Sequence, residues 1–153
     1  MITTEQYFRK PHSPGQKEQA RDLIERRNKL RIEWMQTTGR MACPVDPDTG
    51  AEISGKGGGD GDGGFRTPGS REGAKNSSHR IIDGKGAGID DFALNNEFDT
   101  WLDNFEIPMP NGDEGGNTKL EEHGLYREHP SVTHSWCHLT TRAPNSGKRT
   151  FMP

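Results

Sequence analysis

The sequence has few of the residues that build a hydrophobic core. Leu, Ile, Val and Phe together make up about 15% of the 153 residues, below the roughly 20% at which intrinsic disorder becomes a serious alternative. Disorder also calls for a large net charge, whereas 20 basic residues against 23 acidic ones leave only −3. The composition therefore predicts one folded domain over residues 1–153 with a thin core, which a bound metal ion can help to stabilise.

Other absences exclude whole classes of protein. Two cysteines, Cys43 and Cys137, are too few for a disulfide scaffold, and we expect both to be reduced thiols. No stretch approaches 18 apolar residues, which argues against a membrane span. The first ten residues lack the apolar region of a secretory signal peptide. The balanced charge, with an isoelectric point near 6.1, argues against a nucleic-acid partner.

Two segments have the apolar periodicity of helices that pack on a core. Residues 13–37 open with Ser13-Pro14, an N-cap followed by proline at the first helical position. Residues 94–105 carry apolar side chains at i, i+3, i+4 and i+7, and prolines follow them. The apolar positions are Ala20, Leu23, Ile24, Leu30, Trp34 and Met35 in the first segment and Phe98, Trp101, Leu102 and Phe105 in the second.

Loops and one late strand account for much of the remaining chain. Residues 39–64 and 111–119 are rich in glycine and polar residues; the first range lacks the full ligand pattern of a calcium loop and the closing Lys-Ser/Thr of a phosphate loop. Residues 131–142 mix β-branched and aromatic side chains and predict a strand. Short strands with two helices favour an α+β fold, a small antiparallel sheet with a few helices packed on it.

The six histidines are unevenly placed, and four of them fall within 16 residues near the end of the chain. His79 stands alone in the middle, and a glycine-rich loop separates it from Asp90 and Asp91. Such a loop can fold back so that an imidazole and a carboxylate converge, and His138 would supply a third ligand. Imidazole and carboxylate together bind hydrolytic zinc and leave one position open for water. On spacing alone, a surface histidine and a capping aspartate are the simpler interpretation.

The residues around His79 resemble the signature of the zinc D-alanyl-D-alanine carboxypeptidases and their phage endolysin relatives, the Hedgehog/DD-peptidase fold family. That signature has a strand with Gly-Tyr/Phe-Arg, then Ser-x-His, then Gly-x-Ala/Gly-x-Asp. The matching segments here are Gly64-Phe65-Arg66, Ser77-Ser78-His79 and Gly86-Ala87-Gly88-Ile89-Asp90. The stretch Trp136-Cys137-His138-Leu139 is similar to the family's Trp-x-His-Leu element, and the start ITTEQYF is like that of phage-encoded members.

The resemblance implies a zinc peptidase that cleaves bacterial peptidoglycan stem peptides or cross-links. It implies that His79, Asp90 and His138 bind Zn²⁺. It also implies that Arg66 binds the terminal carboxylate of the stem peptide or its scissile carbonyl. Trp136 would pack beside the site or shape the substrate pocket. Residues 1–40 would form an N-terminal helical segment and residues 60–153 the metal-site core. The protein would be encoded by a bacteriophage and act in lysis or entry, from the host cytoplasm or within a virion with other virion proteins.

The spacing of the first two ligands departs from the family pattern. Ten residues lie between His79 and Asp90, where the family usually has six. Asp91 is therefore an alternative ligand.

The general base is the second departure. Ser135 stands where many family members have an acid that takes the proton from the metal-bound water. His134 is the first candidate to replace it, because a regular strand would place it on the same face as His138. Glu128 and Glu121 are the reserve candidates. The missing acid also supports a second hypothesis, a non-catalytic structural or binding protein of a phage particle that keeps the peptidase fold.

Overall fold

The segment that opens with Ser13 forms the helix that its pattern predicts. The computed structural model describes residues 2–40, 57–70, 75–92 and 96–153, and in it helix α2 spans Pro14–Thr38. The Ser13 hydroxyl accepts a hydrogen bond from the Gln16 N–H, and the Gln16 side chain accepts one from the Ser13 N–H. Gly39, in the left-handed region, ends the helix. Ala20, Leu23, Ile24, Leu30 and Trp34 are all buried, so α2 is a packing helix.

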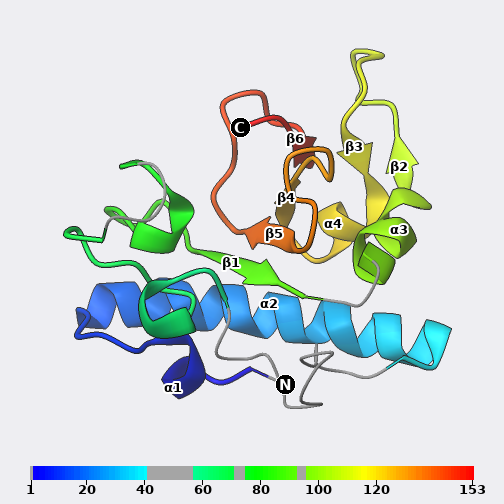
Figure 1. Ribbon diagram of the computed structural model, residues 1–153. Coiled ribbons are helices and arrows are strands. Elements are labelled where there is room, and N and C mark those ends of the chain that lie inside the picture. Colours follow the sequence, from blue (N-terminus) through cyan, green and yellow to red (C-terminus); the bar gives the residue numbers. More distant parts are fainter. Residues whose placement is uncertain (1, 41–56, 71–74, 93–95) are drawn as a thin grey trace.

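A small mixed sheet lies beside this helix, with β1 running along α2 (Figure 1). In spatial order its strands are β1 (Gly88–Asp91), β5 (Cys137–Thr140), β4 (Tyr126–Glu128) and β6 (Thr150–Phe151). Strand β5 pairs antiparallel with both of its neighbours, whereas β6 pairs parallel with β4. The α+β class is confirmed. The prediction of a purely antiparallel sheet is wrong at one edge. Strands β4 and β6 both run opposite to β5, and because β6 pairs with β4 at this edge, these two strands are parallel.

Short helices and a second hairpin complete the described chain. They are α1 (Thr4–Tyr7), η2 (Asp60–Asp62), η3 (Ser78–Arg80), α3 (Glu97–Asp103), β2 (Glu106–Ile107), β3 (Gly116–Asn117) and α4 (Thr118–Glu122). Helix α3 lies within the predicted segment 94–105. Residues 111–119 are not one uninterrupted loop, because β3 pairs with β2 and α4 begins directly after it. Among the described residues, no helix has the length and apolar content needed to cross a membrane.

The late strand is shorter than its composition predicts. It begins only at Cys137, not at residue 131. After Pro130 the backbone forms local turns, in which Val132 N–H donates to His129 O and Thr133 N–H donates to Pro130 O. These N–H groups are therefore not available to pair with a neighbouring strand.

Alternation along the strands separates two faces of the sheet. Asp90 pairs with His138 in the β1–β5 register, and their side chains lie on one face. Asp91 and Cys137 lie on the other face, so Cys137 points away from His138. Both predicted segments, 1–40 and 60–153, contribute to one apolar cluster, whose fully buried members include Tyr7, Leu23, Leu30, Ala87, Leu102, Leu120, Leu125 and Leu139. Cys43 and most of the loop 39–64 lie outside the described residues.

Candidate metal centre

Two imidazoles and one carboxylate, from three separate elements, meet on the face of the sheet opposite Asp91. His79 comes from η3, Asp90 from β1 and His138 from β5. The Asp90 Oδ1 atom lies 2.8 Å from His138 Nδ1 and 3.2 Å from His79 Nε2. One ligand atom of each residue lies within 4.8 Å of the other two, close enough for all three to bind a single ion.

Local backbone structure brings His79 to this position. Ser77 caps the short helix η3, and its hydroxyl accepts a hydrogen bond from the His79 N–H. The His79 carbonyl accepts a hydrogen bond from the Arg66 N–H, which joins the Gly-Phe-Arg segment to the Ser-x-His segment. Tyr7 supports the same region, because its carbonyl accepts the Gly64 N–H and its buried hydroxyl donates to Gly88 O.

Each imidazole is oriented by a contact through its other ring nitrogen. His79 Nδ1 lies 2.7 Å from the Gly64 carbonyl oxygen. Because a carbonyl can only accept, Nδ1 carries a proton, so Nε2 is the nitrogen of His79 whose lone pair could bind a metal ion. His138 Nε2 lies 3.1 Å from the Ser78 hydroxyl. The other ring nitrogen of His138, Nδ1, therefore faces the Asp90 carboxylate. Metal-binding histidines are commonly held in this way.

Burial and the mutual hydrogen bonds set the charges of the three groups. Burial lowers the pKa of His79 despite the nearby carboxylate, which favours the neutral imidazole. Burial also opposes charge on His138, but the hydrogen bond and charge of Asp90 outweigh it and raise the pKa of His138. Burial by itself would raise the pKa of Asp90, yet the hydrogen bonds and charges of the two imidazoles hold it well below its ordinary value. In the metal-free protein, His138 Nδ1 therefore donates a hydrogen bond to the ionised Asp90 carboxylate, and a metal ion would have to displace this proton.

Two glycines let the backbone approach the centre. A Cβ atom on Gly58, whose φ is +82°, would overlap the Asp90 carboxylate. A Cβ atom on Gly88 would overlap the Ser78 hydroxyl. The run of glycines around Gly58 was interpreted from the sequence only as a loop, so its contact with the centre was missed. The available signal was the density of glycine before the Gly-Phe-Arg motif.

The three candidate ligands lie in the wall of a cavity of about 390 Å³, together with Arg66 and Trp136. The half-buried Arg66 is fixed by its Nε–H, which donates to Gly58 O at 2.6 Å. Arg66 and Trp136 therefore lie where the resemblance implies that substrate would bind.

Glu128 also lines this cavity, directly across the sheet from His138. The β4–β5 register pairs Arg127 with Leu139, and one further step sets Glu128 opposite His138. Cross-strand partners have Cβ atoms about 4.5–5.5 Å apart. Among the described residues, none forms a hydrogen bond or ion pair with the Glu128 carboxylate. Its charge adds to that of Asp90 in raising the pKa of His138.

The other candidate bases lie elsewhere. His134 is exposed on a bend before β5, and it is not part of the cavity wall. The argument that placed it beside His138 fails because the strand begins three residues after His134. Glu121 is exposed on α4 and is likewise outside the wall.

Asp91, the alternative ligand, points away from the histidines. Arg27 of α2 grips it with Nε at 2.8 Å from Oδ2 and Nη2 at 2.9 Å from Oδ1. Both side chains have zero exposed surface. The arginine that interrupts the apolar stripe of α2 therefore neutralises Asp91.

A second cluster of metal-binding residue types is already occupied by a cation of the protein. Glu33, Glu122 and His123 lie close enough to one another to share an ion. However, the Lys119 ammonium lies 2.5 Å from Glu33 and 3.1 Å from Glu122. This arrangement is an ion-pair network, and His123 joins it through Glu33.

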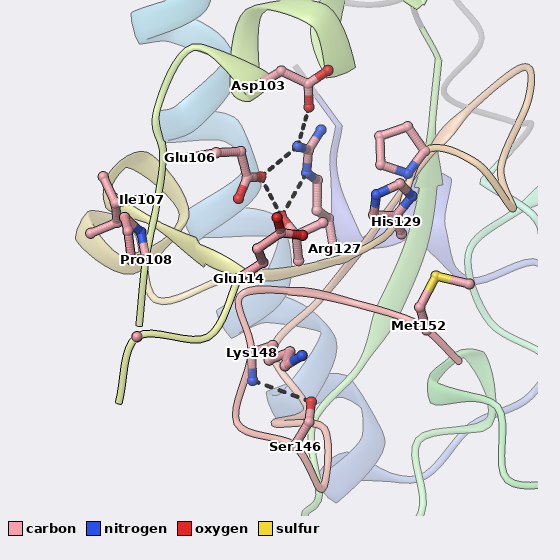
Figure 2. A pocket seen from close by; sticks show the side chains of 14 residues that line it. Asp103, Glu106, Ile107, Pro108, Glu114, Arg127, His129, Ser146, Lys148 and Met152 are labelled. Atoms are coloured by element: carbon pink, nitrogen blue, oxygen red, sulfur yellow. Dashed lines mark hydrogen bonds and ion pairs between the residues drawn. The ribbon is translucent and has the colours of Figure 1, made fainter. Parts of the chain in front are cut away.

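A larger cavity, of about 1000 Å³, lies between the β2–β3 hairpin and the end of the chain (Figure 2). Figure 2 shows the Arg127 guanidinium held by Asp103 and Glu106. Its other nitrogens donate to Asp99 and Thr150, so every nitrogen of this buried group has a partner within the protein. The larger cavity thus holds its arginine in a closed network, and the cluster of two imidazoles and a carboxylate lies in the smaller cavity.

Comparisons with protein-family models, with curated proteins and with solved structures found no match to this chain. The family resemblance of the motifs stays a prediction.

Proposed function

We propose that this protein is a zinc-dependent peptidase of bacterial peptidoglycan peptides. The observation that carries the proposal is the convergence of His79, Asp90 and His138 in the wall of one cavity. Two imidazoles and a carboxylate are a donor set of hydrolytic zinc centres. The order of the motifs around these residues supports peptidoglycan as the substrate and a bacteriophage as the source.

The donor set fits a zinc ion, which would bind His79 Nε2, His138 Nδ1 and the Asp90 carboxylate. Zinc in such a site supplies an activated water near neutral pH and polarises the scissile carbonyl. The Gly64 carbonyl and the Ser78 hydroxyl keep the two rings in orientation.

Arg66 and Glu128 take the remaining roles in the proposed reaction. The Arg66 guanidinium, fixed through Gly58, faces the scissile carbonyl and stabilises the negative charge that develops on its oxygen. The Glu128 carboxylate accepts the proton of the attacking water and returns it to the leaving amine. Glu128 replaces His134 in this role because it lines the cavity opposite His138.

A second candidate is a phage structural or binding protein with reduced chemistry. Ser135 favours it, since this residue occupies the position of the usual acid and has no carboxylate. In this alternative the metal would stabilise the fold, and virion proteins would be the partners.

Metal content and peptide cleavage separate the two candidates. We expect about one zinc per chain by mass spectrometry in the wild type, and loss of that zinc in His79→Ala. Purified peptidoglycan should release new amino groups, a chelator should stop the release, and added zinc should restore it. Zinc without cleavage would favour the structural protein, and a protein that binds no zinc would overturn both interpretations of the centre.

The role of Glu128 has its own matched comparison. Glu128→Gln should keep zinc but lower the rate of cleavage by about 10²–10⁴-fold, the usual contribution of a general base. Glu121→Gln and His134→Gln, outside the cavity, should cleave at the wild-type rate. A loss of activity in His134→Gln and not in Glu128→Gln would return the role to His134.

A further inference from the structure

One motif of the resemblance has no role in the proposed function, the N-terminal stretch ITTEQYF. It contains helix α1, which begins with two reciprocal hydrogen bonds: the Thr3 hydroxyl accepts from the Gln6 N–H, and the Gln6 side chain accepts from the Thr3 N–H. Ile2 is anchored to α2, because its N–H and its carbonyl oxygen both bond the Asn28 side chain. These bonds fix the position of Tyr7 at the end of α1.

Tyr7 forms hydrogen bonds with two segments of the metal centre. Its carbonyl oxygen accepts the Gly64 N–H at 2.8 Å, and the Gly64 carbonyl in turn orients the His79 ring. Its hydroxyl donates at 2.8 Å to the carbonyl oxygen of Gly88, which lies two residues before Asp90 in β1. One residue of α1 therefore bonds the partner of one candidate ligand and the strand of another.

The Tyr7 ring also packs directly against the first of these segments. It is fully buried, and a Cβ atom on Gly64 would lie 2.0 Å from its Cε2 atom. Only glycine lets the ring lie this close to the backbone. Phe8, the next residue, packs with its ring centroid 5.2 Å from that of Phe65. Helix α1 thus restrains the Gly-Phe-Arg segment by both hydrogen bonds and packing.

Such restraint matters for a site whose ligands come from segments far apart in the sequence. Ligands that are held in place before the ion arrives bind it more tightly, because less conformational freedom is lost on binding. His79 and Asp90 would have to meet a zinc ion in nearly tetrahedral geometry. Tyr7 bonds the segments of both at once. Loss of its hydroxyl would release β1 from this bond without removing a ligand.

We propose that Tyr7 is a positioning residue of the zinc centre, which holds the Gly64 carbonyl behind His79 and the strand of Asp90 in fixed relation to each other. This inference rests on the metal centre of the proposed function and extends that centre to α1. It does not depend on peptide cleavage. The N-terminal motif thus takes part in zinc binding although none of its residues is a ligand.

Removal of one hydroxyl tests this role. Tyr7→Phe keeps the ring and should raise the zinc dissociation constant by about tenfold, the lower end of the effect of changing the partner of a metal ligand. Tyr126→Phe is the matched control, because Tyr126 packs on Arg149, lines neither cavity and should bind zinc as the wild type does. Leu102→Val, a core change in α3, should lower the melting temperature and leave zinc affinity unchanged. Competition with a chromogenic chelator measures the affinity, at a temperature at which melting curves show each variant to be folded.

The spectrum of bound Co²⁺ separates positioning from stability. Its visible absorption reports the geometry of the ligands around the ion. The Co²⁺ spectrum of Tyr7→Phe should differ from that of the wild type, and the spectrum of Tyr126→Phe should match it. Tyr7→4-aminophenylalanine, whose amino group can donate to Gly88 O, should restore both the zinc affinity and the spectrum.

The inference is overturned if folded Tyr7→Phe binds zinc as tightly as the wild type, or if Leu102→Val weakens binding to the same extent. If Tyr7→Phe does not fold, two threonines of α1 decide, because Thr3→Ala removes the cap and Thr4→Ala does not. Thr3→Ala should bind zinc more weakly than Thr4→Ala, and equal affinities would overturn the inference. A wild type that binds no zinc overturns both this inference and the metal centre. Zinc binding without peptide cleavage contradicts the peptidase proposal alone.

Discussion

Two neighbouring aspartates of β1 show how differently the two faces of the sheet are built. Asp91 is fully buried, and both of its carboxylate oxygens accept hydrogen bonds from Arg27 of α2. Asp90 keeps 16% of its side chain exposed and faces two imidazoles in a cavity wall. One carboxylate is neutralised by a permanent cation, while the other has partners that are neutral or only partly charged.

The difference teaches that residue type alone does not decide the role of a charged side chain. A guanidinium is always protonated, so the pair of Arg27 and Asp91 is complete and serves the fold. Imidazoles titrate near neutral pH, so the negative charge of Asp90 is not permanently neutralised and can bind a cation. Alternation along a strand is enough to separate the two roles by one residue.

The largest expected effect is on the packed face. Asp91→Asn leaves Arg27 buried without its counter-charge and should lower the free energy of unfolding by about 3–5 kcal/mol. The isosteric Asp90→Asn should destabilise the metal-free protein less than Asp91→Asn does, because Asp90 faces imidazoles and not a buried guanidinium, while it abolishes zinc binding. Urea denaturation of both metal-free variants measures the difference. Equal losses of unfolding free energy in the two variants would contradict the proposed difference between the two faces.

Zinc should stabilise the protein through the other face. At a free zinc concentration of 100 times the dissociation constant, binding adds about 2.7 kcal/mol and raises the melting temperature by several degrees. The shift should vanish in His79→Ala and persist in His123→Ala, whose histidine belongs to the Lys119 network. Thermal melting with and without zinc measures it. A shift that depends on His123 would place the ion in the wrong cluster.

A glycine pair sharpens the comparison further. Gly58 and Gly84 both have positive φ, but only Gly58 is crowded, by Asp90. Gly84→Ala should cost about 1–2 kcal/mol of backbone strain. Gly58→Ala carries the same strain and also displaces the carboxylate, so zinc affinity should fall in this variant alone. Parallel zinc titrations of the two variants decide, and equal affinities would contradict the close contact.

Acid should affect the two faces in separate steps, and this is the smallest effect. Asp90 raises the pKa of His138 above the ordinary imidazole value of about 6.5, so protons already compete with zinc above that pH. Burial would raise the pKa of Asp91, but Arg27 and Arg31 hold it below the ordinary value of about 3.9. The stability from Asp91 is therefore present above pH 4 and is lost as the pH falls below it.

Zinc release and unfolding can be followed in one acid titration with a zinc dye and circular dichroism. Release should precede unfolding, and Asp91→Asn should lose less stability between pH 5 and pH 2 than the wild type. A single transition for both signals would show that the two faces are not independent.

Local patterns were sufficient for part of this architecture. The cap at Ser13 and the apolar spacing predicted α2, because a helix depends on residues close in sequence. The motifs around His79, Asp90 and His138 selected three residues that the structure brings together.

The remaining features depend on contacts between distant segments. The position of Glu128 opposite His138 follows from the β4–β5 register, which no local pattern contains. The turn after Pro130 removed His134 from the strand through backbone hydrogen bonds that composition does not reveal.

Anomalous diffraction at the zinc edge, from crystals grown with equimolar zinc, tests the central claim most directly. The account predicts one peak bonded to His79 Nε2, His138 Nδ1 and the Asp90 carboxylate, at about 2.0–2.2 Å. A peak at Glu33, Glu122 and His123, or none beside Asp90, would contradict it.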